Sequence, residues 1–294
     1  MRLSISITSY TGPIESLVRD LTDVARHADD AGIDTVWVAD HLLQAAPGTQ
    51  VDEPMLEAYT TLGYLAAVTT RVRLGTMVTG VTFRPPAVLI KAVTTLDVLS
   101  GGRAWLGLGA GYHQAEADMM GLPLPPTAER FEQLEETLRL AGQMWAGNDS
   151  SFEGRHFTLQ QPVSSPAPVQ RPHPPILVGG AGEKRTLRLV AQYADACNLF
   201  DIPDGGATLR HKLGTLADHC TAVGRQYHDI EKTVSTRLEP DEQPAAFVTR
   251  CEQFAQLGLE HAVVITSGAW DTDSVARLGA AVPLVRDLPA RVAG

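Results

Sequence analysis

The sequence predicts an α/β fold, a (β/α)8 TIM barrel with an insertion between the regions of its fourth and fifth strands. Eight apolar, strand-like runs alternate with eight segments of helical periodicity. Such alternation indicates parallel strands joined by crossover helices, and eight such units close a barrel. The length of 294 residues suits a barrel of about 250 residues with additions. We therefore predict a single barrel domain over residues 1–294.

The expected strands share a short and nearly continuous apolar character, which is typical of strands buried on both faces of a parallel sheet. In chain order they are LSISIT (3–8), TVWVAD (35–40), VRLGTMVT (72–79), AWLGLGAG (104–111), PILVGG (175–180), DACNLF (195–200), TVSTRL (233–238) and HAVVIT (261–266). The segments between them have the period of helices. The first places Leu17, Leu21 and Val24 on one stripe and ends at Gly32, a residue type that commonly terminates helices.

Residues 147–174 interrupt this alternation. The segment is rich in Ser, Pro and Gly, carries one strand-like piece at HFTL (156–159), and is too long for an ordinary connection in a barrel. Two interpretations stay open. The segment is either an insertion that crosses the barrel and acts as a lid, or a stiff surface connection with no part in function.

Charge and hydropathy exclude several classes of protein. The net charge is −10, the isoelectric point is near 5.3, and no run of Lys or Arg is present, which argues against a general nucleic-acid binder. No apolar run approaches the length that spans a bilayer, and the N-terminal MRLSISITSY alternates like a strand. We expect a cytoplasmic, soluble protein with a small-molecule substrate and no nucleic-acid or membrane partner.

The three cysteines, Cys197, Cys220 and Cys251, are too few and too scattered for a disulfide framework or a zinc site. We interpret them as reduced thiols of the core. No metal site is expected.

The active site of such a barrel lies at the carboxyl ends of its strands. Asp40 and His41 end the second expected strand. An imidazole exchanges protons at neutral pH, so this pair suits proton transfer. Alternatively, the pair caps the next helix or bonds to the backbone.

Glycines end the fifth expected strand and lead into a helix, in ILVGGAGEKRTLRLVA (176–191). Their open backbone N–H groups and the positive end of the helix dipole predict a phosphate site. Lys184 and Arg185, expected in the first turn of that helix, oppose the helix dipole, and a bound anion would offset this cost. Plain solvated charge is the alternative. The fourth strand leads into a similar but weaker pattern at GLGAGYHQAEADMMG (107–121).

Four segments together resemble the bacterial luciferase-like superfamily, and most of all its short F420-dependent oxidoreductases. They are TVWVADH (35–41), residues 71–116 with LDVLSGGRAWLGLGAG, AERFEQLEETL (128–138) and PPILVGGAGEKRTLRLVAQYADACN (174–198). The resemblance extends from the first strand to about residue 200 and fades afterwards. It implies a barrel that binds coenzyme F420 across its carboxyl-terminal mouth, and a homodimer formed by barrel helices.

The resemblance also implies roles for individual residues. A non-proline cis peptide would lie behind the cofactor ring near Met77, Val78 and Thr79, between Met77 and Val78. The cofactor phosphate would be held by Gly179, Gly180, Ala181 and Gly182, with help from Gly109, Ala110 and Gly111, and with Lys184, Arg185 and Arg188 as candidate cations. His41 would be the proton partner. Asp40 would hold the His41 tautomer or contact the deazaflavin edge.

The chain departs from the sugar-phosphate dehydrogenases of that family. Where they carry an acidic glutamate, it has Tyr112, then His113 and later Glu116, and their tryptophan after the strand-two histidine is absent from HLLQ (41–44). Glucose 6-phosphate is therefore not the expected substrate. The predicted substrate pocket comprises Glu57, Tyr112, His113 and Trp270. Packing or surface roles for Tyr112 and His113, and a dipole-favoured charge at Glu57, remain alternatives.

The leading functional hypothesis is hydride transfer between F420 and an organic substrate. Two rivals stay open: an FMN- or FMNH2-dependent monooxygenase, and a flavin-binding protein without turnover. Cofactor identity separates the first rival, because a deazaflavin does not support the oxygen chemistry of a flavin. Loss of a substrate pocket would mark the second.

Overall fold

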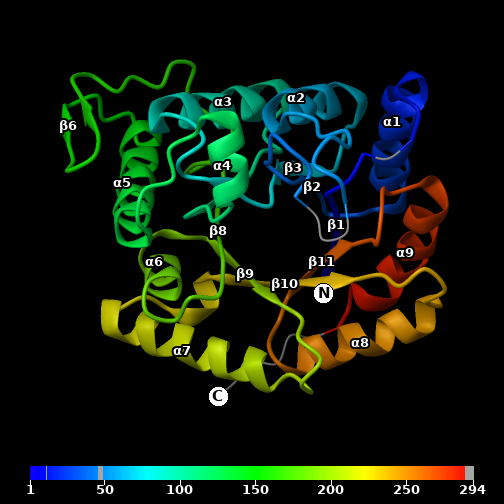
Figure 1. Ribbon diagram of the computed structural model, residues 1–294. Helices are drawn as coiled ribbons and strands as arrows, with labels where there is room; N and C mark the ends of the chain where they lie inside the picture. The colour runs from blue at the N-terminus through cyan, green and yellow to red at the C-terminus, as the bar shows by residue number, and fades with distance from the viewer. Residues whose placement is uncertain (11, 46–48, 289–294) are drawn as a thin grey trace.

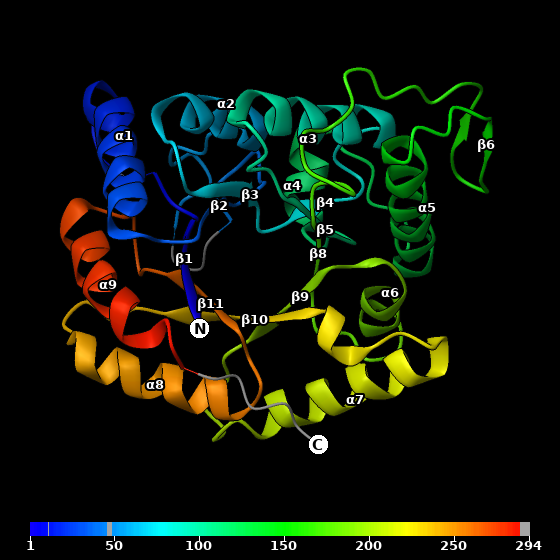
Figure 2. The same ribbon diagram turned by 180° about the vertical axis from the view of Figure 1, so that it is seen from behind.

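The protein is a ring of parallel strands surrounded by helices (Figures 1 and 2). The structure is a computed structural model that describes residues 1–10, 12–45 and 49–288. The strands of the ring are β1 (Arg2–Ile7), β2 (Thr35–Val38), β3 (Arg73–Thr76), β4 (Thr79–Gly80), β5 (Leu106–Gly109), β8 (Ile176–Gly179), β9 (Ala196–Phe200), β10 (Glu231–Arg237) and β11 (His261–Ile265). The expected strand over 72–79 corresponds to two pieces, β3 and β4. With that refinement, the predicted eight-unit barrel is confirmed.

The strands follow the order β3-β2-β1-β11-β10-β9-β8-β5-β4. β4 pairs with β5, and an isolated parallel bridge between Leu74 and Ala104 joins β3 to the start of β5. At this seam the Leu74 N–H donates to the Arg103 carbonyl at 2.8 Å, and the Trp105 N–H donates to the Leu74 carbonyl at 2.8 Å. These bonds close the ring.

Helices cover the outside of the ring in chain order (Figure 1). They are α1 (Ile14–Ala31), α2 (Ala58–Val68), α3 (Pro86–Ser100), α5 (Thr127–Trp145), α6 (Thr186–Tyr193), α7 (Ala207–Val223), α8 (Pro244–Gln256) and α9 (Thr272–Val285), with a short 3-10 helix at Tyr227–Asp229. An additional helix, α4 (Gln114–Met120), lies in the connection from β5 to α5. None of the helices within the described residues is long and apolar enough to cross a membrane.

Two tryptophans fill the inside of the barrel. The rings of Trp37 and Trp105 lie 5.5 Å apart, and the Trp37 indole donates to the Ser4 hydroxyl at 3.0 Å. A Cβ atom at Gly75 would lie 2.7 Å from Cβ of Trp105 and 2.8 Å from the Trp37 ring, so these two side chains exclude any larger residue there. The cysteines are free and buried, as predicted, and burial raises the pKa of the Cys197 thiol to about 12.

The segment 147–174 contains a small antiparallel pair, β6 (Phe152–Glu153) and β7 (Thr158–Leu159). The Glu136 carboxylate of α5 accepts the N–H groups that follow β6, including that of Phe157 at 3.0 Å. Farther along, Asp97 of α3 accepts the Val169 N–H at 2.6 Å. These contacts, and the position of β6 beside α5 in Figure 1, place the described part of the segment on the outside of the helical layer rather than across the barrel.

A charged cluster closes the end of the barrel at which the strands begin. Glu231 accepts from Arg2 at 2.6 Å and from Nδ1 of His261 at 2.7 Å. His261 is fully buried, and its Nε2 has no hydrogen-bond partner among the described residues. Desolvation opposes ionisation of Glu231, but His261 and Arg2 outweigh it and lower the pKa of the Glu231 carboxyl to about 2.

Candidate active site

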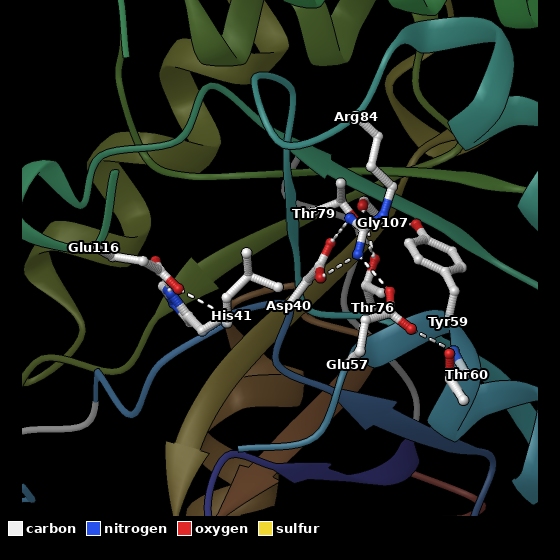
Figure 3. Close-up of polar contacts among 11 residues, drawn as sticks. Asp40, His41, Glu57, Tyr59, Thr60, Thr76, Thr79, Arg84, Gly107 and Glu116 are labelled. Atoms are coloured by element: carbon white, nitrogen blue, oxygen red, sulfur yellow. Dashed lines mark hydrogen bonds and ion pairs between the residues drawn. The ribbon is translucent and has the colours of Figure 1, made fainter. Parts of the chain in front are cut away.

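A buried ion pair lies where β2 ends, at the end of the barrel that carries the carboxyl ends of the strands (Figure 3). Asp40 is 2% exposed and receives both Nη atoms of Arg84, at 2.6 and 2.9 Å. Arg84 also donates to Glu57 at 2.6 Å. Burial alone would lower the pKa of Arg84, but the bonds and charges of Asp40 and Glu57 raise it above the ordinary value. This fork-to-carboxylate geometry fixes the Asp40 side chain in place.

Glu57 has two roles in this cluster. It is the N-cap of α2, where its carboxylate accepts the Thr60 N–H at 2.6 Å, and it is the second partner of Arg84. Desolvation would raise the pKa of Glu57, yet these bonds lower it overall. Glu57 is therefore a charge at a helix N-terminus, as its alternative interpretation stated, and through Arg84 it is also part of the polar cluster at the mouth of the barrel.

A chain of hydroxyl groups links α2 to the seam of the barrel. Tyr59 bonds to Thr79 at 2.8 Å, Thr79 bonds to Thr76 at 3.0 Å, and Thr76 donates to the Gly107 carbonyl at 2.9 Å. The Arg84 guanidinium lies 4.8 Å from the centre of the Tyr59 ring. Burial raises the pKa of Tyr59 above its ordinary value, so the phenol stays protonated and can donate within this chain.

His41 is held by a carboxylate from α4. Nδ1 of His41 lies 2.7 Å from Oε2 of Glu116, whose other oxygen accepts the N–H groups of Leu42 at 2.5 Å and Leu43 at 3.2 Å. The Glu116 side chain is fully buried, and the His41 side chain is 19% exposed. Desolvation opposes ionisation of Glu116, but the bonds from His41 and the backbone lower its pKa below the ordinary value. Glu116 is therefore an anion at neutral pH.

Aromatic rings surround His41. The ring centres of Phe83, Tyr112 and His113 lie 6.4, 6.0 and 5.9 Å from that of His41, each in an edge-on arrangement. His113 caps α4, because its Nδ1 accepts the Glu116 N–H at 3.0 Å. Tyr112 is 71% exposed. Tyr112 and His113, two of the four residues predicted for a substrate pocket, thus lie beside His41. His113 also has a structural role as the N-cap of α4.

A cavity of about 510 Å³ opens in the mouth on the side of β8 to β11. One side of the cavity is formed by Met77 and Val78, which form a bulge after β3, and by the end of β8. The other side is formed by polar residues of β9, β10 and the loops that follow them. Its lining includes Met77, Val78, Gly179, Gly180, Asn198, Asp201, Ser235, Thr236, Arg237 and Arg250. A hydrophilic wall thus faces the bulge across an open space.

Comparison with known proteins places the chain in a family. The family model described as luciferase-like monooxygenase matches residues 3–280. The chain belongs to this family.

Curated relatives in the family act with F420. The chain is 33% identical over 269 residues to the F420-dependent glucose-6-phosphate dehydrogenase of Kineococcus radiotolerans, covering 90% of this chain and 76% of the relative. It is 28% identical over 246 residues to the enzyme of the same name from Amycolatopsis mediterranei, covering 82% of this chain and 71% of the relative.

Solved structures confirm the fold. An F420-dependent secondary alcohol dehydrogenase in complex with an F420-acetone adduct superposes with a TM-score of 0.83 at 18% identity, covering 97% of this chain and 99% of that one. The F420-dependent tetrahydromethanopterin reductase of Methanopyrus kandleri superposes with a TM-score of 0.79 at 16% identity, covering 96% and 98%.

In this luciferase-like barrel the bond between Met77 and Val78 is cis, at the predicted place. The Val78 side chain then fills the space between two glycines, because a Cβ atom at Gly109 or Gly179 would lie 2.9 Å from its methyl groups. These two glycines, predicted for phosphate binding, are thus required by the packing of the bulge itself. Gly180 has a φ of +109°, a conformation that favours glycine.

The predicted cations lie outside the helix in which they were expected. α6 begins at Thr186, so Lys184 and Arg185 occupy the turn between Gly182 and the helix. The Arg185 guanidinium lies 5.6 Å from the Phe131 ring. Farther along α6, Arg188 bonds to Glu135 at 3.2 Å. Lys184 therefore lies before the helix, and the argument that it opposes the helix dipole from within the first turn does not apply. Lys184 and Arg185 are instead two cationic side chains that directly follow the glycine turn.

Trp270 occupies a different place from the one predicted. It is 6% exposed, and its indole donates to the Ser6 carbonyl at 3.0 Å. It lines a small space of about 40 Å³ beside α1 with residues such as Tyr10, and it is absent from the lining of the mouth cavity. Because its polar atom is satisfied by β1, Trp270 packs in the core.

The prediction that Asp40 orients His41 is corrected by the structure. Asp40 is bound by Arg84, and Glu116 holds the imidazole. Consecutive residues of an extended chain project to opposite sides, so the carboxylate next in sequence is the wrong partner. Arg84 had no role in the sequence-based site. A signal existed for Arg84, since an arginine directly before a Pro-Pro helix start follows the third strand.

Proposed function

We propose that this protein is an F420-dependent oxidoreductase that transfers a hydride between the deazaflavin and an organic substrate. The observation that carries the proposal is the 33% identity to an F420-dependent dehydrogenase along 90% of the chain. The geometry supports it, because Met77, Val78, Gly179 and Gly180 line one cavity, and an imidazole held by Glu116 follows the neighbouring strand β2.

The residues of the mouth fit such a cofactor. Met77, Val78 and Thr79 form a bulge that borders the cavity of about 510 Å³, and they would support the ring. The backbone from Gly179 to Gly182 and from Gly109 to Gly111 would receive the phosphate, with Lys184 and Arg185 at the rim. The buried Thr82 hydroxyl has no partner among the described residues and lies beside Gly111, where a polar ligand group would satisfy it.

His41 is the proposed proton partner. When bound, F420 supplies or accepts a hydride, and the substrate must then gain or lose a proton. His41 lies at the mouth, and its Nε2 has no hydrogen-bond partner among the described residues. An imidazole is suited to this exchange near neutral pH. Asp40, fixed by Arg84, would contact the cofactor edge.

The substrate is proposed to be a neutral, polar molecule. The wall of β9 and β10 offers Asn198, Ser235 and Thr236, which are uncharged hydrogen-bonding groups. The two arginines that line the described cavity already have partners: Arg237 donates to the Thr266 carbonyl at 3.0 Å, and Arg250 donates to Glu242 at 2.7 and 2.5 Å. Arg250 is thus paired with a carboxylate, and the carboxylates of Asp201 and Glu239 also line the cavity, which disfavours a phosphate ester.

Fluorescence titration of the purified chain with F420 and, in parallel, with FMN tests the proposal. We expect F420 to bind at least about tenfold more tightly, which corresponds to ~1.4 kcal/mol. The reverse preference would favour the rival monooxygenase, which the description of the family model also names. Binding of neither cofactor would contradict the proposal.

We extend the proposal to location and assembly: a cytoplasmic enzyme that forms a homodimer through barrel helices. Exposed apolar side chains on the outer helices support the second part, among them Val88 at 55% and Leu99 at 67% exposed. Light scattering of the purified chain measures the assembly state, and a monomeric mass would remove this part of the proposal.

A further inference from the structure

We propose that Glu116 is a positioning residue that keeps the proton of His41 on Nδ1, and so reserves Nε2 for proton exchange with the substrate. This inference rests on the proposed function for its catalytic meaning. Its structural content concerns only the described residues of α4 and the end of β2, and it can be measured without substrate.

The direction of the bond follows from the chemistry of the partner. An ionised carboxylate only accepts hydrogen bonds, so at 2.7 Å from Oε2 of Glu116 the Nδ1 atom of His41 must be the donor. The carboxylate cannot turn away, because its Oε1 accepts from both Leu42 and Leu43, and its side chain is fully buried. In the neutral ring Nδ1 therefore carries the proton and Nε2 carries the lone pair.

The other neighbours of His41 do not compete for this role. Phe83 and Tyr112 contact the ring by their edges. His113 uses its Nδ1 to cap α4. The nearest further carboxylate in sequence, Asp40, is occupied by Arg84. Among the described residues, Glu116 alone bonds to the His41 ring, so it decides the tautomer.

This tautomer defines the chemistry that His41 can perform. In the oxidative direction Nε2 of His41 would accept the hydroxyl proton of an alcohol, while bound F420 would take up the hydride from the same carbon. A C–H and an O–H bond would break, a C=O bond and an N–H bond on His41 would form, and the two electrons lost by the substrate would leave with the hydride. The imidazolium formed is stabilised by the Glu116 carboxylate, as in other His–carboxylate pairs. The reverse reaction returns the proton from Nε2 to a carbonyl oxygen. Such a proton exchange would serve an alcohol and carbonyl pair as substrate.

Nitrogen NMR of the apo protein, labelled with 15N-histidine, tests the inference. His41 is assigned by the signal that His41→Ala removes, and the tautomer is taken from the spectrum of its neutral ring. We expect a protonated Nδ1 and an unprotonated Nε2 in the unmodified chain. A proton on Nε2 would overturn the inference whatever the variants do.

Glu116→Gln is the decisive variant. Its amide oxygen would accept the Leu42 and Leu43 N–H groups, which leaves the NH2 group facing Nδ1 of His41. The proton should then move to Nε2, and F420 reduction with a turned-over alcohol should fall at least about tenfold. A retained Nδ1 proton in this variant would count against a positioning role.

Asp118→Asn is the matched control. Asp118 lies on the same helix, is exposed, and bonds to Gln114 at 2.7 Å, so the control removes one negative charge from α4 without touching His41. In this variant the tautomer of His41 should be the same as in the unmodified chain. If F420 fails to bind the unmodified chain while the tautomer pattern holds, the proposed function fails and the assignment of Glu116 as the partner that fixes His41 stands.

Discussion

Two histidine–glutamate pairs lie at opposite ends of this barrel, and their contacts are alike while their surroundings differ. His41 and Glu116 at the mouth, and His261 and Glu231 at the other end, are each joined through Nδ1 at 2.7 Å. His41 keeps 19% of its side chain exposed, whereas His261 is fully buried. The lesson is that the pair itself does not define a function. What differs is access to the ring, since part of the His41 side chain is exposed and none of the His261 side chain is.

The positions of the two histidine–glutamate pairs in the barrel agree with their difference in exposure. The carboxyl ends of the strands carry the catalytic groups of such barrels, and the opposite end serves stability. At the mouth, Arg84 binds Asp40 and Glu57, while the wall of β9 and β10 leaves a cavity open. At the other end, Arg2 completes a buried cluster around Glu231. The comparison therefore predicts stability effects at one pair and turnover effects at the other.

The largest expected effect is on stability, at the buried pair. The pKa of Glu231 is lowered to about 2, which links its ionisation to about 3 kcal/mol of folding free energy. Because the folded-state pKa lies below the ordinary value, this stability is present above about pH 4.5 and is lost as the pH falls towards 2. Glu231→Gln should cost about 3 kcal/mol at neutral pH and should flatten that acid dependence, as measured by urea unfolding across pH.

Cofactor binding by the folded fraction of Glu231→Gln should stay within about twofold of the unmodified value. A loss of F420 affinity without loss of stability would break the comparison, because it would show that the buried end communicates with the mouth.

The next effect is on turnover, at the exposed pair. His41→Ala should lower kcat by about 10²-fold or more, because the proton partner is lost, and leave F420 affinity within about tenfold. Stopped-flow reduction of F420 with the alcohol substrate measures the first quantity, and fluorescence titration measures the second. Unchanged turnover would remove His41 from the mechanism and make the two pairs equivalent.

The smallest effect is expected on the open wall of the mouth. Ser235 bonds to Asn198 at 2.9 Å and lines the cavity. Ser235→Ala should raise the KM of a neutral polar substrate by up to about fivefold, the equivalent of ~1 kcal/mol for one hydrogen bond, with kcat and F420 affinity unchanged. An equal fall in kcat would instead place Ser235 in the reacting centre.

Much of the fold could be predicted from the sequence because it depends on local pattern. Each barrel strand is an apolar run, and α1 ends at Gly32 with a left-handed C-cap, as its sequence indicates. The division of the third strand into β3 and β4 has no local signal, and only the resemblance to a family located the bulge at Met77 and Val78. The extent of α6 was missed because the glycine turn continues through Arg185.

The site was less predictable because its bonds join distant parts of the chain. Arg84 lies 44 residues from Asp40, and Glu116 lies 75 residues from His41. A sequence identifies which strand ends carry ionisable groups, but the partner of each group depends on how loops from neighbouring units pack. Trp270 illustrates the same limit, because its indole bonds to the Ser6 carbonyl of β1 and its ring does not line the mouth cavity.

The contact of Val78 with Gly109 and Gly179 has a consequence for sequence change over evolutionary time. A methyl group added at either glycine would compete with the Val78 side chain for the same volume. A barrel with alanine at position 109 or 179 would need a smaller residue at position 78. These three positions should therefore covary among descendants of this sequence, although they belong to three different β-strand regions of the chain.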